Sequence, residues 1–200
     1  LRDVDLDGVM DLAVGAYGDE DGGSNCGAAY ILFLTTDGLV KTAQKISNYY
    51  GNFPYTLGGS DNFGHSQTLG SGDLDGDGVT DLAVGAYADD DGGTDSGSVY
   101  ILFLTTEGVV KSAQKISEYY GRLGYYLDTY DYFGTATTLA DVDGDGMQDL
   151  IVGAYGDDDA GGASGAVYVL FLQATCPTPA PTPLPTTFPT TAQPTSQPTS

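Results

Sequence analysis

Three nine-residue segments share the pattern Asp-x-Asp-x-Asp-Gly-x-x-Asp, at residues 3–11, 73–81 and 141–149. In a tight loop, carboxylates at positions 1, 3 and 5 converge on one point, and the glycine at position 6 permits a sharp turn. Position 7 can offer a backbone carbonyl, and the aspartate at position 9 closes the site. Hard oxygen ligands gathered at one point suit Ca²⁺, which takes roughly six to eight of them at about 2.3–2.6 Å.

The sequence therefore predicts about three Ca²⁺ sites, one in each loop. Valine occupies position 12 of every loop, where an EF-hand has a bidentate glutamate, so these loops are not EF-hands. Zn²⁺ is disfavoured without histidine or cysteine nearby, and Mg²⁺ is disfavoured because it tolerates few protein ligands. An acidic turn without an ion is the alternative, but its carboxylates would repel one another. The predicted ligands are Asp3, Asp5, Asp7, Val9, Asp11, Asp73, Asp75, Asp77, Val79, Asp81, Asp141, Asp143, Asp145, Met147 and Asp149.

The acidic residues recur at fixed points of the chain. Of 28 aspartates and glutamates, 12 lie in these loops, 10 lie in three later loops and 6 lie elsewhere. Against 6 lysines and arginines they give a formal net charge of −22, which excludes nucleic acids and anionic membranes as main partners. No run of about 18 apolar residues exists, so we expect no membrane span. Such a charge opposes compaction unless cations neutralise it.

The acidic loops belong to a longer repeat. Residues 73–87 match residues 3–17 and 141–155, at offsets of 70 and 68 residues. The apolar run at 99–104 also returns in both other copies, which is the signature of a repeat architecture. We expect three repeats across residues 1–172, at about 1–62, 63–132 and 133–172, followed by a separate tail at 173–200.

Each repeat has the pattern of β-strands. Residues 81–87 are small or β-branched, 99–104 form an apolar run that predicts burial on both faces, and 109–117 alternate as a half-exposed strand does. A further strand precedes the metal loop, near 66–72 and 135–140. The predicted class is all-β, with four-stranded antiparallel blades in three β-propeller-like units. The first unit lacks its first strand and the third its fourth, so one chain alone does not close the array.

The chain resembles the FG-GAP repeats of the integrin α-subunit N-terminal β-propeller. The pairs at 63–64 and 133–134 match the FG element, and Gly-Ala-Tyr at 15–17, 85–87 and 153–155 matches the GAP element with tyrosine in place of proline. The acidic loop lies between the two elements, as in that family. The resemblance implies four-stranded blades with Ca²⁺ held by the loop aspartates between the first and second strands. The family's closed propeller has more blades than this chain.

A second set of acidic loops follows the Gly-Ala-Tyr segments, at 19–21, at 89–91 with Asp95, and at 157–159. These loops are either solvated polar turns or second Ca²⁺ sites in which neighbouring repeats share an ion. Three adjacent aspartates cannot all point inward, which favours the solvated turn.

Side chains with other reactive chemistry are few. His65 is the only histidine, and no nucleophile or acid stands at a definable position beside it, so we expect no enzyme. Cys26 and Cys176 are either two thiols or a disulfide, and their spacing leaves both open.

Two further repeated features have structural interpretations. The lysines are interpreted as exposed charges that blunt a strand edge: Lys41, Lys45, Lys111 and Lys115. Tyrosine pairs at 49–50, 119–120 and 125–126 either pack the long loops or form a surface for a carbohydrate or protein partner.

The tail at 173–200 carries no charge and holds eight of the nine prolines, mixed with threonine and serine. This composition cannot build a core and favours an extended polyproline II conformation. It is typical of O-glycosylated stalks, and a plain linker is the alternative. No Asn-x-Ser/Thr sequon occurs, so glycans on the tail would be O-linked or on hydroxylated proline.

Together these features predict an extracellular or cell-surface, calcium-binding module with a structural or adhesive role, such as a subunit of a coat or fibrous appendage. Its open first and last blades favour head-to-tail assembly with copies of itself or with other extracellular proteins. The alternatives are a ligand-binding, integrin-like propeller fragment of a larger receptor and an accessory repeat array of a secreted hydrolase.

Overall fold

The computed structural model describes residues 2–69, 72–159, 161–162 and 164–172, which contain ten β-strands and no helix, hence none that could cross a membrane. The predicted tail at 173–200, including Cys176, lies outside these residues. The strands are β1 (Leu12–Ala16), β2 (Ala28–Leu34), β3 (Val40–Ile46), β4 (Ser66–Leu69), β5 (Leu82–Ala86), β6 (Ser98–Leu104), β7 (Val110–Ile116), β8 (Phe133–Ala140), β9 (Asp149–Ala154) and β10 (Ala166–Leu170).

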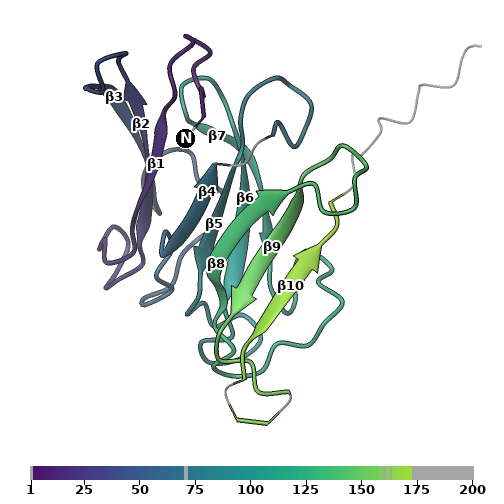
Figure 1. Cartoon of the computed structure of the whole chain (residues 1–200). Helices are drawn as coiled ribbons and strands as arrows, with labels where there is room; N and C mark the ends of the chain where they lie inside the picture. The colour runs from purple at the N-terminus through teal and green to yellow at the C-terminus, as the bar shows by residue number, and fades with distance from the viewer. Residues whose placement is uncertain (1, 70–71, 160, 163, 173–200) are drawn as a thin grey trace, which may run out of the picture.

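The strands form three antiparallel sheets, β1-β2-β3, β4-β5-β6-β7 and β8-β9-β10, which lie side by side like blades (Figure 1). The strand register repeats from sheet to sheet. Leu82 pairs with Leu102 in the middle sheet, and the equivalent leucines pair in the two outer sheets. The predicted all-β class with antiparallel, propeller-like repeats is therefore confirmed.

Four strands, the number predicted for a complete blade, occur only in the middle sheet. The first and third sheets have three strands each within the described residues, as expected from the first strand missing in the first repeat and the fourth missing in the third. The described chain starts at Arg2, directly before the first acidic loop. In the third repeat, the residues aligned with β7 include Pro179, Pro181 and Pro183, and proline has no N–H to donate to a strand ladder.

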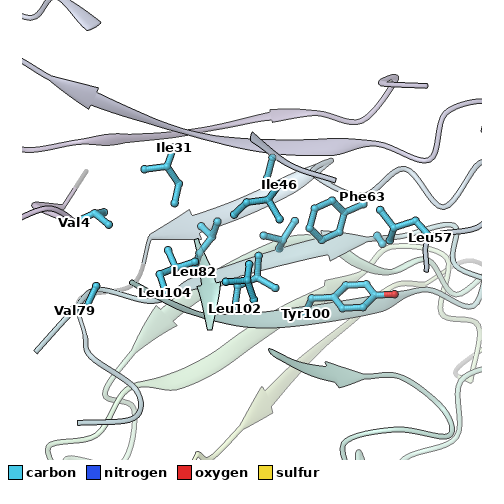
Figure 2. Packing of buried hydrophobic residues seen from close by; sticks show 14 of the residues in the cluster. Val4, Ile31, Ile46, Leu57, Phe63, Val79, Leu82, Tyr100, Leu102 and Leu104 are labelled. Atoms are coloured by element: carbon cyan, nitrogen blue, oxygen red, sulfur yellow. The ribbon is translucent and has the colours of Figure 1, made fainter. Parts of the chain in front are cut away.

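Apolar cores fill the spaces between the sheets. Ile31 of the first sheet packs in one cluster with Leu102 of the middle sheet (Figure 2). Val99 of the middle sheet packs in a second cluster with Leu150 of the third sheet. Strand β6 serves both clusters, because successive side chains of a strand point to opposite faces. The apolar run at 99–104 is therefore buried on both faces, as predicted.

The FG element connects each repeat to the next. Gly27 forms an isolated parallel bridge with Phe63, and Gly97 forms the same bridge with Phe133. Both phenylalanine side chains are fully buried. A Cβ atom at Gly97 would lie 2.1 Å from the carbonyl oxygen of Phe133, so only glycine allows the two backbones to approach this closely.

A pair of glycine substitutions tests this contact. Gly38→Ala places alanine at a φ of +80° with no atom within 4 Å of its Cβ, so it should cost only the left-handed strain of about 1–2 kcal/mol. Gly97→Ala, at a φ of +93°, adds a clash with backbone that cannot move easily. We expect Gly97→Ala to lower the free energy of unfolding in urea distinctly more than Gly38→Ala. Equal losses would contradict a close contact between repeats.

Candidate metal centre

The acidic loops are shaped by residues in the left-handed backbone region. The glycines at position 6 have φ of +89°, +89° and +90°. Position 4 is also left-handed, with φ of 83° at Gly76 and 80° at Gly144, but the first loop has Leu6 there at 61°. A left-handed leucine is strained by about 1–2 kcal/mol, so the first loop adopts at a cost the conformation that glycine permits in the other two.

The aspartate at position 1 organises each turn by accepting backbone hydrogen bonds. In the second loop, the N–H of Gly78 donates to Asp73 Oδ2 at 2.5 Å, and the N–H of Asp77 donates to Asp73 Oδ1 at 2.9 Å. The position-6 N–H makes the same bond in the first and third loops, at 2.8 and 3.0 Å. These bonds hold the position-1 carboxylate inside its own loop.

Three carboxylates of each loop meet. Oxygens from positions 1, 3 and 9 all lie within 4.8 Å of one another in every loop. The clusters are Asp3, Asp5 and Asp11; Asp73, Asp75 and Asp81; and Asp141, Asp143 and Asp149. Negative charges at this separation repel, and hard oxygens so placed could hold a divalent cation.

The aspartate at position 9 is buried and joins two parts of its repeat. Asp81 Oδ2 accepts the N–H of Leu74 at 2.7 Å, and its Oδ1 accepts the N–H of Leu104 at 3.0 Å. The equivalent aspartates make the same two bonds in the other repeats. Burial raises the pKa of Asp81 to about 6, because desolvation disfavours the charged form.

The aspartate at position 5 lies outside the three-carboxylate clusters. Asp77 Oδ1 accepts the N–H of Val79, the position-7 residue, at 2.8 Å, and the other two loops repeat this bond. Lys111 bridges the carboxylates of Asp77 and Asp75, with its Nζ 2.8 Å from Asp75 Oδ2. A hydrogen bond from Lys111 lowers the pKa of Asp77. Lys41 bridges positions 3 and 5 of the first loop in the same way.

The second acidic loops of the first two repeats surround a lysine. Lys115 Nζ lies 2.8 Å from Asp89 Oδ2 and 2.5 Å from Asp91 Oδ2, the latter as an ion pair without hydrogen-bond geometry. The Tyr100 hydroxyl donates to Asp89 at 3.1 Å. Lys45 makes the equivalent ion pairs one repeat earlier. In these two repeats, a lysine therefore faces carboxylates that the sequence assigned to solvent or to a second ion.

The interpretation of the lysines as exposed edge charges needs correction. It is wrong for Lys115, which is only 7% exposed. Lys41 and Lys111 are exposed, but each bridges two loop carboxylates. Sequence patterns did not show these pairs, since the partners lie at least 26 residues apart along the chain.

A cavity of about 280 Å³ beside Lys115 is lined by residues of the first and second repeats. Asp61 lines it together with Asp89 and Lys115, and Asp61 Oδ2 accepts the N–H of Gly58 at 2.7 Å. Burial, with a further contribution from Asp89, raises the pKa of Asp61 to about 6.

The single histidine lies in a row of aromatic rings. The His65 ring is 5.6 Å from that of Tyr17 and 4.5 Å from that of Tyr87. Tyr132 continues the row and stacks on Tyr155 at 4.8 Å. The row crosses all three repeats, and the repeated tyrosine of the GAP element was its sequence signal.

The tyrosine pairs of the long loops are exposed, yet each contributes to packing. Tyr50 and Tyr120 lie over the ammonium groups of Lys45 and Lys115, at 5.5 and 5.6 Å. Tyr125 packs edge-on against Tyr168 at 5.5 Å. Each pair thus combines a packing contact with exposed side-chain surface.

Comparison with known proteins identifies the repeats. A model of the FG-GAP repeat matches residues 67–102 and 133–170, and a second model with the same description matches residues 2–33. The chain is 33% identical to phosphatidylinositol-glycan-specific phospholipase D of Rattus norvegicus over 152 residues, covering 75% of this chain and 17% of that protein. It is 34% identical to integrin alpha-PS2 of Drosophila melanogaster over 168 residues, covering 78% and 11%. The chain thus spans less than a fifth of the length of these relatives.

Asp61 should give the folded state a pH dependence that one substitution isolates. Its folded pKa of about 6 lies above the ordinary value of 3.8, so the folded state retains a proton that the unfolded state has lost. The stability that Asp61 contributes is present below about pH 4 and is lost as the pH rises through about 6. Asp61→Asn should therefore gain stability relative to the parent chain across this window in urea titrations. Asp128→Asn, at an exposed site, is the control, and a constant difference for Asp61→Asn would refute the assignment.

Proposed function

We propose that this chain, which belongs to the FG-GAP repeat family, is an extracellular calcium-binding module with a structural or adhesive role. The observation that carries the proposal is the cluster of carboxylate oxygens within 4.8 Å, built by the same three loop positions in each repeat. Charges this close repel, and a bound divalent cation would replace repulsion by coordination. The integrin alpha relatives support an extracellular or cell-surface location.

Calcium fits the groups that each loop offers. Positions 1, 3 and 9 would supply carboxylate oxygens, with position 5 and the carbonyl of position 7 as further ligands. Asp5 Oδ1 is buried and has no hydrogen-bond partner among the described residues, which is costly unless a cation or water satisfies it. Bound Ca²⁺ would supply positive charge to a chain of net charge −22 and would cross-link the loop through its buried position-9 aspartate.

The repeat region itself is a non-catalytic module of the FG-GAP type, and we propose that the chain has no enzymatic activity. A second candidate is an accessory array of a secreted hydrolase. The match to a phospholipase D favours it, although only the repeat region of that protein matches.

The tail completes the proposed module. Its uncharged Pro/Thr/Ser composition at 173–200 supports an O-glycosylated stalk that separates the repeats from a surface, as in a coat or fibrous appendage. The proposed partners are other copies of the chain or other extracellular proteins, because the outer sheets have open edges within the described residues.

Calcium should raise the temperature of unfolding, and EGTA should reverse the rise, because the loops are assembled only in the folded state. One site saturated at about 100 times its Kd adds about 2.7 kcal/mol. Titration calorimetry should give about three ions per chain. Asp75→Asn and Asp143→Asn should each remove one ion, whereas Asp158→Asn, outside the clusters, should remove none. A melting temperature insensitive to EGTA, without heat of binding, would rule out the proposal.

Lys111, beside the metal loop at 73–81, should weaken calcium binding by that loop. Lys111 Nζ lies 2.8 Å from Asp75 Oδ2, so its charge opposes a cation at the same carboxylates. Lys111→Gln should tighten one site by about two- to fivefold, the effect of roughly 0.4–1 kcal/mol at an exposed pair. Lys45→Gln, whose ammonium pairs outside the metal loop, is the matched control. Equal or weaker binding after Lys111→Gln would contradict competition.

A further inference from the structure

The outer edge of β10 differs from the equivalent edges of the other sheets. Strands β2 and β6 are covered by β3 and β7, whereas no strand among the described residues pairs with the outer edge of β10 (Figure 1). An open edge presents backbone N–H and C=O groups that can pair with an added strand.

The two covering strands show what chemistry this edge would accept. Strands β3 and β7 differ at one position only, with sequences VKTAQKI and VKSAQKI. In register, Lys45 lies opposite Tyr30 and Lys115 lies opposite Tyr100, and each ammonium enters the second acidic loop of its repeat. A covering strand therefore supplies a cation as well as backbone hydrogen bonds.

The third repeat has the acidic half of this arrangement without a lysine. Asp157, the equivalent of Asp89, is buried, and the hydroxyl of Tyr168 donates to its Oδ2 at 2.8 Å. None of the four lysines of the chain pairs with Asp157 in the structure. A buried carboxylate without a counter-ion is costly, and a lysine opposite Tyr168 would supply that counter-ion.

A loop of the first repeat anchors β7, the covering strand of the middle sheet. In the middle sheet, the N–H of Val110 donates to the carbonyl of Gly51 at 3.0 Å, and Asn52 Nδ2 donates to the carbonyl of Val110 at 2.9 Å. The hydroxyl of Tyr55 accepts the N–H of Lys115 at 3.2 Å. The preceding repeat thus anchors β7 at both of its ends.

Gly121, Arg122 and Tyr125 are equivalent to Gly51, Asn52 and Tyr55, and they would anchor a strand that covers β10. The backbone is in the same state, with φ of 74° at Gly51 and 73° at Gly121. Tyr125 packs edge-on against Tyr168 at 5.5 Å, as Tyr55 packs against Tyr100 at 5.3 Å. Cavities of about 340 and 370 Å³ border Tyr125 along β10, where the middle sheet has β7.

We propose that the outer edge of β10 binds an extended, lysine-bearing strand supplied by a separate polypeptide, which pairs with β10 and places its ammonium against Asp157. Residues 173–200 contain no lysine, and their prolines lack the N–H groups that a ladder requires. The charge of Asp157 favours a basic residue opposite Tyr168, and the anchoring loop favours a strand of the β7 type. The inference does not depend on calcium, so its failure and that of the proposed function are distinguishable.

A peptide with the sequence of residues 107–118 is the probe, added to the full chain and followed by fluorescence anisotropy. We expect saturable one-to-one binding, with slower amide hydrogen exchange at 166–172. Lys115→Ala in the peptide should weaken binding at least about tenfold, because it leaves a buried charge unpaired, whereas Gln114→Ala should have little effect. In the protein, Asp157→Asn and Tyr125→Ala should weaken binding, whereas Asp158→Asn and Tyr126→Ala should not.

The proposal is overturned by either of two results: no saturable binding at millimolar peptide, or equal affinity for the Lys115→Ala and unaltered peptides. Protection located away from β10 would overturn it as well. Should Asp157→Asn fail to fold, the peptide variants and the Tyr125/Tyr126 pair still decide the question, since both tyrosines are exposed.

Discussion

Each acidic loop is fixed to the rest of its repeat by one buried carboxylate. Asp81 accepts a backbone hydrogen bond from the start of its loop and another from the end of β6, and the other two repeats do the same. A charged group is buried here only because both its oxygens are satisfied. The loop therefore cannot shift without breaking these two hydrogen bonds, and the positions of the neighbouring carboxylates follow from this connection.

The same constraint explains how lysines neutralise part of the negative charge of the chain. Because the loops are held rigidly against the sheets, a lysine on the outer strand can reach two carboxylates at once, as Lys111 does at the metal loop and Lys115 at the second acidic loop. The outer strand thus contributes charge neutralisation as well as backbone pairing. In the third sheet, which lacks this strand among the described residues, Asp157 has the tyrosine hydroxyl but no lysine.

Much of this architecture could be predicted from the sequence, because the repeat aligns three independent copies of each strand and loop. The apolar run at 99–104 predicted a strand buried on both faces, and the aspartate spacing predicted converging carboxylates. The lysine partners were missed, since they depend on the β6–β7 register and on distances that a linear pattern does not contain. The position-5 aspartates lie outside the three-carboxylate clusters, because a two-residue turn draws Oδ1 of each to the position-7 N–H, which the linear spacing did not show.

Repetition also means that one sequence position has different energetics in different sheets. Val99 and Val167 occupy equivalent positions, yet Val99 is fully buried against the third sheet and Val167 is 70% exposed. The difference comes from the neighbour and not from the residue, because a repeat of this kind buries its faces only by stacking on another. The contacts of Gly27 with Phe63 and of Gly97 with Phe133 fix how the repeats stack, whereas the buried aspartate fixes each loop within its own repeat. The acidic loops can therefore retain their geometry in an outer sheet whose apolar face is open, which separates the proposed cation chemistry from the completeness of the array.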